Sequence, residues 1–175
     1  MIARHGVGPL FAAILAAVLV MHFLGWMYSL PFWLVAGAML VLYRDPDRQI
    51  PSRPLSVVSP VDGRVASVSH APDPYLERAS LKISIEMNPL GVFTTRSPVE
   101  GKVLEPHGHN GNNNEPHGVW LQTDEGDDIV MVMNRGRMNN KPHCYIRFGE
   151  RVGQGRRCGF VHWGGRIDVY LPDYS

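Results

Sequence analysis

The stretch Gly159–Pro172 reads GFVHWGGRIDVYLP and joins two apolar runs through a short turn. Gly164 and Gly165 stand side by side between the runs, and paired glycines of this kind are typical of a turn. Ile167–Leu171 is rich in β-branched and aromatic residues, which predicts a strand after that turn. The stretch therefore indicates a mainly β fold, in which one strand ends at a Gly-Gly turn and another begins.

The residues on the N-terminal side of this stretch have the same character. Leu81–Met87 alternates apolar and polar residues with a period of two, which predicts a half-buried strand. Val119–Gln122 and Ile129–Met133 flank a polar hexapeptide and predict a hairpin. Further short strands are expected at Tyr145–Arg147 and Gly159–Val161, on either side of a turn rich in glycine.

An internal repeat supports the β interpretation. Ser59–Val65 reads SPVDGRV, and Ser97–Val103 reads SPVEGKV. In each copy the proline fixes φ, the acid can bond to nearby backbone, and the glycine can supply a left-handed conformation before a strand resumes. Phe148–Gly159 resembles the Gly-Asp-x-Val-x-x-Gly-Gln turn of biotinyl and lipoyl domains. We therefore expect a small β-sandwich or barrel built from lipoyl-like hairpins.

The N-terminal segment predicts a membrane anchor. Val7–Tyr43 contains no Lys, Arg, Asp or Glu, and a bilayer span needs about 20 apolar residues. The sequence breaks at Gly25–Pro31, where Ser29 can cap a helix and Pro31 is tolerated in a first turn. We predict a transmembrane helical hairpin over residues 1–43 and a β domain over residues 44–175.

The charges flanking this hairpin predict its orientation. Arg4 precedes the first apolar segment, and Arg44 and Arg48 follow the second. Under the positive-inside rule both ends are cytoplasmic. We therefore expect the protein in the cell's inner membrane with its soluble domain on the cytoplasmic side. A cleaved signal peptide is the competing interpretation, but the apolar run is too long for one and lacks a clear cleavage site.

Charge is distributed unevenly along the rest of the chain, although the formal net charge is only +1. Glu105–Asp128 carries six acids and no Lys or Arg, whereas Arg135–Arg166 carries eight bases against Glu150 alone. A basic stretch near a membrane favours anionic headgroups by about 1 kcal/mol per residue, and a solvated face of a barrel is an equally good interpretation. No nucleic-acid motif is present, so we expect no nucleic-acid partner.

The cysteines and histidines indicate neither a disulfide framework nor a metal centre. Cys144 and Cys158 lack the Cys-x-x-Cys spacing, which favours a reduced domain facing the cytosol. Cys158 as a nucleophile would lack a paired base. His107 and His109 could ligate a metal together with His117, His143, Glu105 or Glu115. The loop around them is rich in Gly, Asn and Pro and does not preorganise ligands, so we expect no metal.

Four stretches resemble the phosphatidylserine decarboxylase family. Gly159–Pro172 is similar to its processing site, Gly-Phe-Ile-Arg-Phe-Gly-Ser-Arg-Val-Asp-Val-Tyr-Leu-Pro. Tyr43–Arg48 resembles its Phe-Arg-Asp-Pro-x-Arg, and Val58–Val65 its Ser-Pro-Ala-Asp-Gly-x-Val. Met87–Pro98 looks like its Ser-Pro-Leu-Asp-Val-His-Val-Asn-Arg-x-Pro. The order and spacing hold from about residue 7 to residue 172, nearly the whole chain.

The resemblance implies a self-processing reaction and a set of site positions. In the family a serine attacks the preceding glycine carbonyl, and the resulting ester eliminates to a pyruvoyl group, the electron sink for decarboxylation. A histidine takes the serine proton and an aspartate orients the histidine. Here the aspartate position is Asp62 and the glycine is Gly164, but Phe93 stands at the histidine position and Gly165 at the serine position.

These two replacements lead to the functional prediction. Phenylalanine cannot move a proton, and glycine has neither a hydroxyl nor a β-carbon. We predict a membrane-anchored pseudoenzyme that forms no pyruvoyl and binds amino- or anionic phospholipid, with Asp62 serving as a turn residue. The alternative is an active pyruvoyl-dependent phosphatidylserine decarboxylase that makes phosphatidylethanolamine by another route to an electrophilic carbonyl. The family continues for a strand pair beyond the point where this chain ends, and open sheet edges then predict a homo-oligomer.

Overall fold

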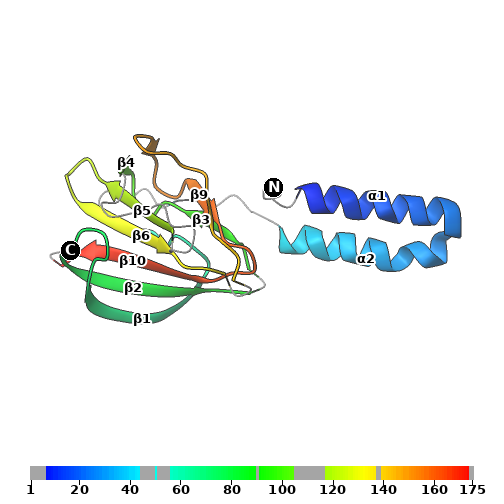
Figure 1. The fold of residues 1–175 in the computed structure, drawn as a ribbon, viewed down its shortest axis with the longest axis horizontal. Coiled ribbons are helices and arrows are strands. Elements are labelled where there is room, and N and C mark those ends of the chain that lie inside the picture. Colours follow the sequence, from blue (N-terminus) through cyan, green and yellow to red (C-terminus); the bar gives the residue numbers. More distant parts are fainter. Residues whose placement is uncertain are drawn as a thin grey trace. The chain divides into compact units, whose positions relative to one another are not determined.

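A computed structural model describes residues 7–43, 50, 56–89, 91–104, 117–136 and 139–173. The chain forms two compact units, divided between Gln49 and Ile50. Figure 1 shows that the first unit contains the helices and the second the strands.

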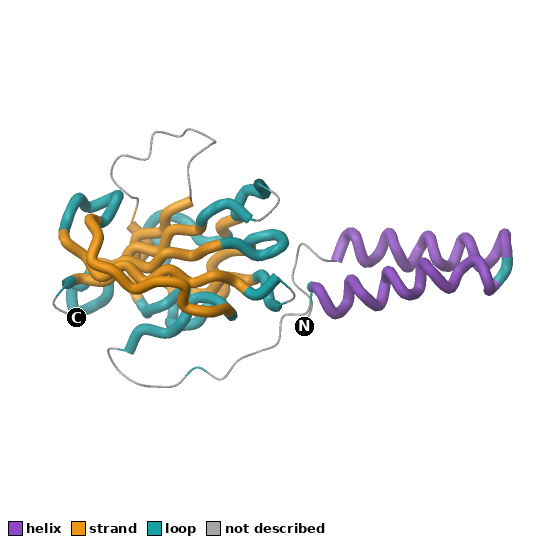
Figure 2. The backbone as a smooth tube through the Cα atoms, turned by 90° about the horizontal axis from the view of Figure 1, so that it is seen from below, coloured by secondary structure: helices purple, strands orange, loops and turns teal. Residues whose placement is uncertain are grey.

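The first unit is a pair of apolar helices, α1 (Val7–Leu24) and α2 (Trp26–Leu42), which lie side by side in Figures 1 and 2. Gly25 separates them with a φ of 97°, a left-handed value that glycine adopts without strain. The predicted helix pair is confirmed. The prediction that Ser29 caps the second helix is wrong, because the chain turns earlier, at Gly25. Ser29 lies inside α2, where its hydroxyl donates to the carbonyl of Trp26 at 2.7 Å.

The second unit consists of two antiparallel sheets, as the two layers of strands in Figure 2 show. The larger sheet has seven strands in the spatial order β1 (Gly63–Pro72), β2 (Ala79–Met87), β10 (Arg166–Pro172), β6 (Asp128–Met133), β5 (His117–Gln122), β4 (Gly101–Leu104) and β8 (Arg151–Val152). The smaller sheet has the order β3 (Thr94–Arg96), β9 (Arg157–Phe160) and β7 (His143–Cys144). The mainly β fold class predicted from the sequence is confirmed.

Alternating residues of the larger sheet build its core. Ile85, Met131 and Ile167 belong to one buried cluster that also includes Cys158 and Val161 from the segment around the smaller sheet. On the opposite face a second cluster is made by Val130, Val132 and Tyr170 and is packed against Tyr75, Leu76 and Trp120. The larger sheet is therefore apolar on both faces over its central strands.

The sequence located most strands and misplaced one. The alternation at 81–87 and the hairpin of β5 and β6 are confirmed. The strand predicted at Tyr145–Arg147 is wrong, because β7 ends at Cys144. Tyr145 still donates its N–H to the carbonyl of Cys158 at 2.8 Å. The Arg147 N–H donates to the carboxylate of Glu150 at 3.2 Å, and Gly149 adopts a φ of 79°, so the chain turns there.

The internal repeat is also a structural repeat. The hydroxyl of Ser59 donates to the carbonyl of Val61 at 2.8 Å, and that of Ser97 to the carbonyl of Val99 at 2.7 Å. A strand begins after each corner, β1 at Gly63 and β4 at Gly101. The prediction of left-handed glycines is wrong, since neither glycine has a positive φ.

Close approach of backbones explains these two glycines instead. A Cβ on Gly63 would lie 2.0 Å from the carbonyl oxygen of Glu86 in β2. A Cβ on Gly101 would lie 2.3 Å from the carbonyl oxygen of Gln122 in β5. Both corners therefore press their glycine against the backbone of a neighbouring strand, where no side chain fits.

Candidate functional site

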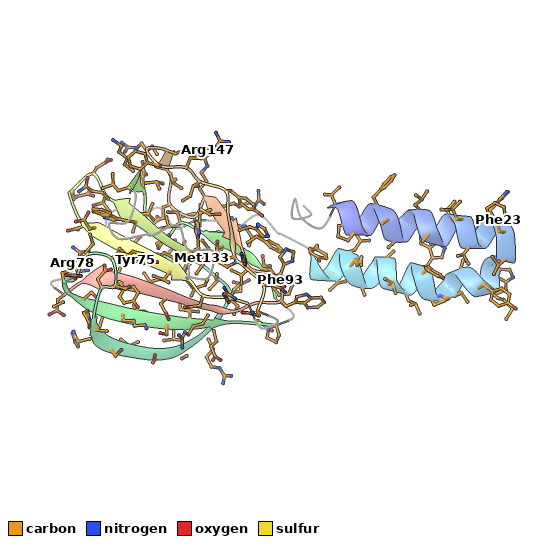
Figure 3. All side chains as sticks on the ribbon, viewed as in Figure 1. Phe23, Tyr75, Arg78, Phe93, Met133 and Arg147 are labelled. Carbon is orange, nitrogen blue, oxygen red and sulfur yellow. The ribbon has the colours of Figure 1, made fainter. Side chains whose placement is uncertain are left out.

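Phe93 lies at one end of the β unit, next to the residues that follow β9 (Figure 3). Its side chain is buried and packs edge-on against Phe160, with ring centroids 6.1 Å apart. The ring also lies 6.4 Å from that of Trp163. Its carbonyl accepts a hydrogen bond from the N–H of Val161 at 3.0 Å. Phe93, the position at which the resemblance predicts a histidine, thus lies in an aromatic environment.

A strained turn leads from β9 to Gly165. The N–H of Gly164 donates to the carbonyl of Val161 at 3.3 Å, which closes the turn. Trp163 has a φ of 61° and Gly164 a φ of 70°. Left-handed backbone costs a residue with a side chain about 1–2 kcal/mol, so Trp163 is held in this conformation by its surroundings. Its side chain is nevertheless 43% exposed.

Gly165 itself is not strained, but its surroundings are close. Its φ is not positive. A Cβ built there would lie 3.2 Å from the carbonyl oxygen of Arg135 and from a methyl of Val161, and 3.3 Å from the Cα of Gly136. Shifts of a few tenths of an ångström would accommodate it. The backbone conformation of Gly165 therefore does not demand glycine, and a side chain there would require its neighbours to shift.

Backbone hydrogen bonds bring the four predicted site positions to one end of the β unit. The carbonyl of Gly165 accepts from the N–H of Met87 at 2.9 Å. The carbonyl of Asp62 accepts from the next N–H, that of Asn88, at 3.1 Å. Phe93 comes shortly after along the same chain and is bonded to Val161. The four positions are therefore close, although Phe93 and Gly165 supply none of the polar atoms that the family's reaction needs.

Asp168 centres a polar cluster that the sequence did not reveal. Its side chain is 3% exposed and accepts hydrogen bonds from Ser84 at 2.6 Å and Asn134 at 2.9 Å. Lys82 and Arg166 each lie 3.4 Å from a carboxylate oxygen. Burial opposes ionisation, but the two hydrogen bonds and two positive charges outweigh it and lower the pKa of Asp168. The signal for this cluster in the sequence was an acidic residue, Asp168, that alternates with apolar residues in a predicted strand.

The cysteines do not supply a replacement nucleophile. Cys158 is fully buried, and its sulfur lies 3.5 Å from the hydroxyl of Thr95. Burial raises the pKa of its thiol to about 12. Burial also raises the pKa of Cys144, which is partly exposed. Because the thiolate is the reactive form of cysteine, both side chains are poorly suited to attack at neutral pH.

The predicted histidine cluster lies mostly outside the described residues, which omit 105–116 and hence His107, His109, Glu105 and Glu115. Within the described ranges, no group of three or more His, Cys, Asp or Glu side chains could hold a metal ion. His143 instead packs edge-on against His162, with ring centroids 5.7 Å apart. The aromatic cluster around Phe93 thus extends to the imidazole rings.

Comparison with known proteins identifies the class to which this fold and site belong. Residues 37–174 match the family described as phosphatidylserine decarboxylase. The phosphatidylserine decarboxylase proenzyme of Nitrosomonas europaea is 38% identical, over 98% of this chain and 84% of that protein. The proenzyme of Burkholderia cenocepacia is 37% identical, over 98% and 85%. These are proteins of phospholipid metabolism. The chain belongs to the phosphatidylserine decarboxylase family, as the sequence motifs predicted.

Among solved structures, glucose permease IIA from Mycoplasma capricolum covers 71% of this chain and 83% of its own at 16% identity. The TM-score is 0.48, too low to support an argument about fold or function.

Proposed function

We propose that this chain is a membrane-anchored, phospholipid-binding member of the phosphatidylserine decarboxylase family that does not process itself. The observation that carries the proposal is the pair of side chains at the reacting positions. Gly165 has no hydroxyl, and Phe93 has an apolar ring packed against Phe160 and Trp163. The remainder of the site segment keeps the order of the family's sequence motifs.

The chemistry of self-cleavage explains why these two side chains matter. In the family's reaction the serine oxygen attacks the preceding glycine carbonyl carbon, so that an ester forms as the peptide C–N bond breaks. An elimination then breaks the serine Cβ–O bond and releases the upstream chain as a carboxylate. Gly165 has neither the hydroxyl oxygen nor the Cβ, so the ester cannot form and the elimination cannot occur. The residues present do not fit the formation of a pyruvoyl group. The name proenzyme, which the relatives carry, is consistent with this cofactor in those proteins.

Exposed aromatic and basic groups near the site support phospholipid binding. Trp163 presents part of its indole to solvent, and indole rings favour the boundary between apolar and polar phases. The carbonyl of Arg135 lies beside Gly165, and Arg166 follows it directly. Guanidinium groups bind phosphate and carboxylate well. An anionic or amino phospholipid headgroup is therefore the ligand class we propose.

The apolar helix pair supports the proposed anchor over residues 1–43, with the β domain over 44–175. By length and composition α1 can cross a membrane, with 18 residues and a hydropathy of 2.3, whereas α2 has 17 residues. Large apolar side chains such as Phe23 and Leu34 are 75% exposed, as lipid-facing residues would be. The charges flanking the pair favour an inner-membrane location with the β domain in the cytoplasm. Self-association of the chain is part of the proposal.

The family membership favours a second candidate, an active pyruvoyl-dependent phosphatidylserine decarboxylase making phosphatidylethanolamine. It would have to obtain an electrophilic carbonyl without a serine at residue 165. The two candidates differ in the mass of the purified protein, since activity of the family's kind requires cleavage before residue 165.

The deciding experiment is the intact mass of the full chain purified in detergent. A single species near 19.5 kDa is expected. Loss of the peptide that begins at Gly165 would overturn the proposal and favour the active enzyme. Lipid binding is tested separately by native mass spectrometry with phosphatidylserine, phosphatidylethanolamine and phosphatidylcholine. Preferential retention of the first two is expected, and equal retention of all three would remove the headgroup preference.

A further inference from the structure

Three charged side chains form a row across β1, β2 and β10, which lie side by side in Figure 1. Glu86 in β2 pairs directly with Arg64 in β1 and with Arg166 in β10. Directly paired residues of an antiparallel sheet point to the same face, and neighbouring strands lie about 4.8 Å apart. A carboxylate therefore stands between two guanidinium groups, and we call these three side chains the charged row.

The charged row lies on the face of the sheet that points away from the main core. The residues next to it along β2 and β10, Ile85 and Ile167, belong to the buried cluster, and successive residues of a strand point to opposite faces. Arg64 and Glu86 are exposed, and the side chain of Arg166 is 54% exposed. A ligand can therefore reach all three charged groups from solvent.

The charges of the row are not neutralised by neighbouring side chains. Among the described residues, neither the guanidinium of Arg64 nor the carboxylate of Glu86 has an ion-pair partner. Arg166 turns its Nε toward Asp168, 3.4 Å away, and its terminal nitrogens contact no acid in the described part of the chain. Ion pairs between exposed side chains contribute little free energy. A ligand that matches the alternating charges can therefore compete with any pairing within the row.

The charged row adjoins the candidate site. Arg166 follows Gly165 directly, and the carbonyl of Gly165 accepts a hydrogen bond from the N–H of Met87, the residue after Glu86. The turn that ends at Gly165 also carries Trp163, whose indole is partly exposed. An amphipathic aromatic ring next to charged groups suits a ligand that has both apolar and charged parts.

We propose that the charged row recognises phospholipid headgroups that carry a primary amine, and that Glu86 determines this specificity. The ammonium donates to the carboxylate of Glu86, while the phosphate, two carbons away, accepts from a guanidinium beside it. In a serine headgroup the additional carboxylate meets the second guanidinium. The quaternary ammonium of choline has no N–H to donate. The inference deepens the proposed phospholipid binding and rests on it, but it does not depend on whether the chain cleaves itself.

Native mass spectrometry of the full chain in detergent tests the proposal, with phosphatidylethanolamine and phosphatidylcholine competing at equal concentration. Wild type should retain about tenfold more phosphatidylethanolamine, because a hydrogen bond to a charged group is lost with choline. Glu86→Gln removes the charge and should reduce this preference to about twofold or less. Glu125→Gln is the matched control, because Glu125 is exposed in the turn between β5 and β6. A preference that survives in Glu86→Gln, or that falls equally in both variants, would overturn the assignment.

A second variant distinguishes recognition from a general loss of binding. Glu86→Lys reverses the central charge and should shift the preference toward phosphatidylglycerol, whose headgroup is anionic and has no amine, without loss of the β-sheet circular dichroism signal. An unchanged order of preference in this variant would also overturn the assignment of Glu86. A wild-type chain that retains none of these lipids would instead remove the proposed phospholipid binding itself, and this inference with it.

Discussion

Glycines occupy both the repeated corners and the candidate site, but for different physical reasons. At Gly63 and Gly101 a β-carbon would lie 2.0 and 2.3 Å from a backbone carbonyl oxygen, a distance that no rotation of a side chain can relieve. At Gly165 the nearest atoms are 3.2 Å away. Close backbone contact therefore requires glycine at the two corners, whereas a side chain at Gly165 needs its neighbours to shift by a few tenths of an ångström. The packing constraint is stronger at the corners than at the predicted serine position.

The largest effect that would test this difference is expected at a corner. Gly101→Ala should destabilise the β unit by about 3 kcal/mol, because the new methyl group meets the carbonyl of Gln122. Urea unfolding followed by the β-sheet circular dichroism signal measures the loss. Gly153→Ala is the matched control, since a β-carbon there has nothing within 4 Å. Equal stability of the two variants would show that the close approach is not what fixes glycine at the corner.

A second prediction concerns the polar cluster that supports the strand after the site. Asp168→Ala should cost about 2 kcal/mol at pH 7, because Ser84 and Asn134 lose their acceptor. The folded pKa of Asp168 is lowered, so its contribution is present above the unfolded value, near 3.9, and is lost as pH falls through the folded value.

Urea unfolding of both proteins between pH 7 and pH 2.5 measures this contribution. The gap between wild type and Asp168→Ala should narrow as the solution becomes acidic. Asp173→Ala, which removes an exposed acid paired with His70, serves as the control and should change stability little. A gap that stays constant down to pH 2.5 would contradict the assignment of the lowered pKa to this cluster.

A smaller change is expected when the serine is restored. Gly165→Ser should alter stability by about 1 kcal/mol or less, because only shifts of a few tenths of an ångström are needed. The single variant should stay uncleaved, since Phe93 cannot accept the proton. The double variant Phe93→His/Gly165→Ser regains both groups and should release a peptide that begins at residue 165, detected by intact mass. Cleavage in the single variant would show that Phe93 is not a barrier.

The sequence predicted the fold better than the details of the site. Alternation at 81–87 and the hairpin of β5 and β6 depend on local pattern, and both are confirmed. The repeat predicted corners correctly but gave the wrong reason for their glycines, because contact with β2 and β5 is not visible in a local pattern. For the same reason the hydrogen bonds and ion pairs around Asp168 were not predicted from the sequence. The resemblance to the family pointed to positions 93 and 165, whereas the left-handed backbone of Trp163 could not be predicted from the sequence.

Trp163, in the same turn, is the counterpart to Gly165. Its left-handed backbone favours glycine, yet the residue is tryptophan. Trp163→Ala removes the ring and keeps the strain, whereas Trp163→Gly removes both. The glycine variant should therefore be the more stable of the two by about 1 kcal/mol, measured by urea unfolding, and equal stabilities would contradict the assigned strain. If the difference is found, this turn carries a side chain at Trp163, where the backbone favours glycine. It lacks one at Gly165, where the backbone conformation accepts a side chain. Folding alone would then not account for the tryptophan at residue 163, whereas a ligand that contacts its exposed indole would.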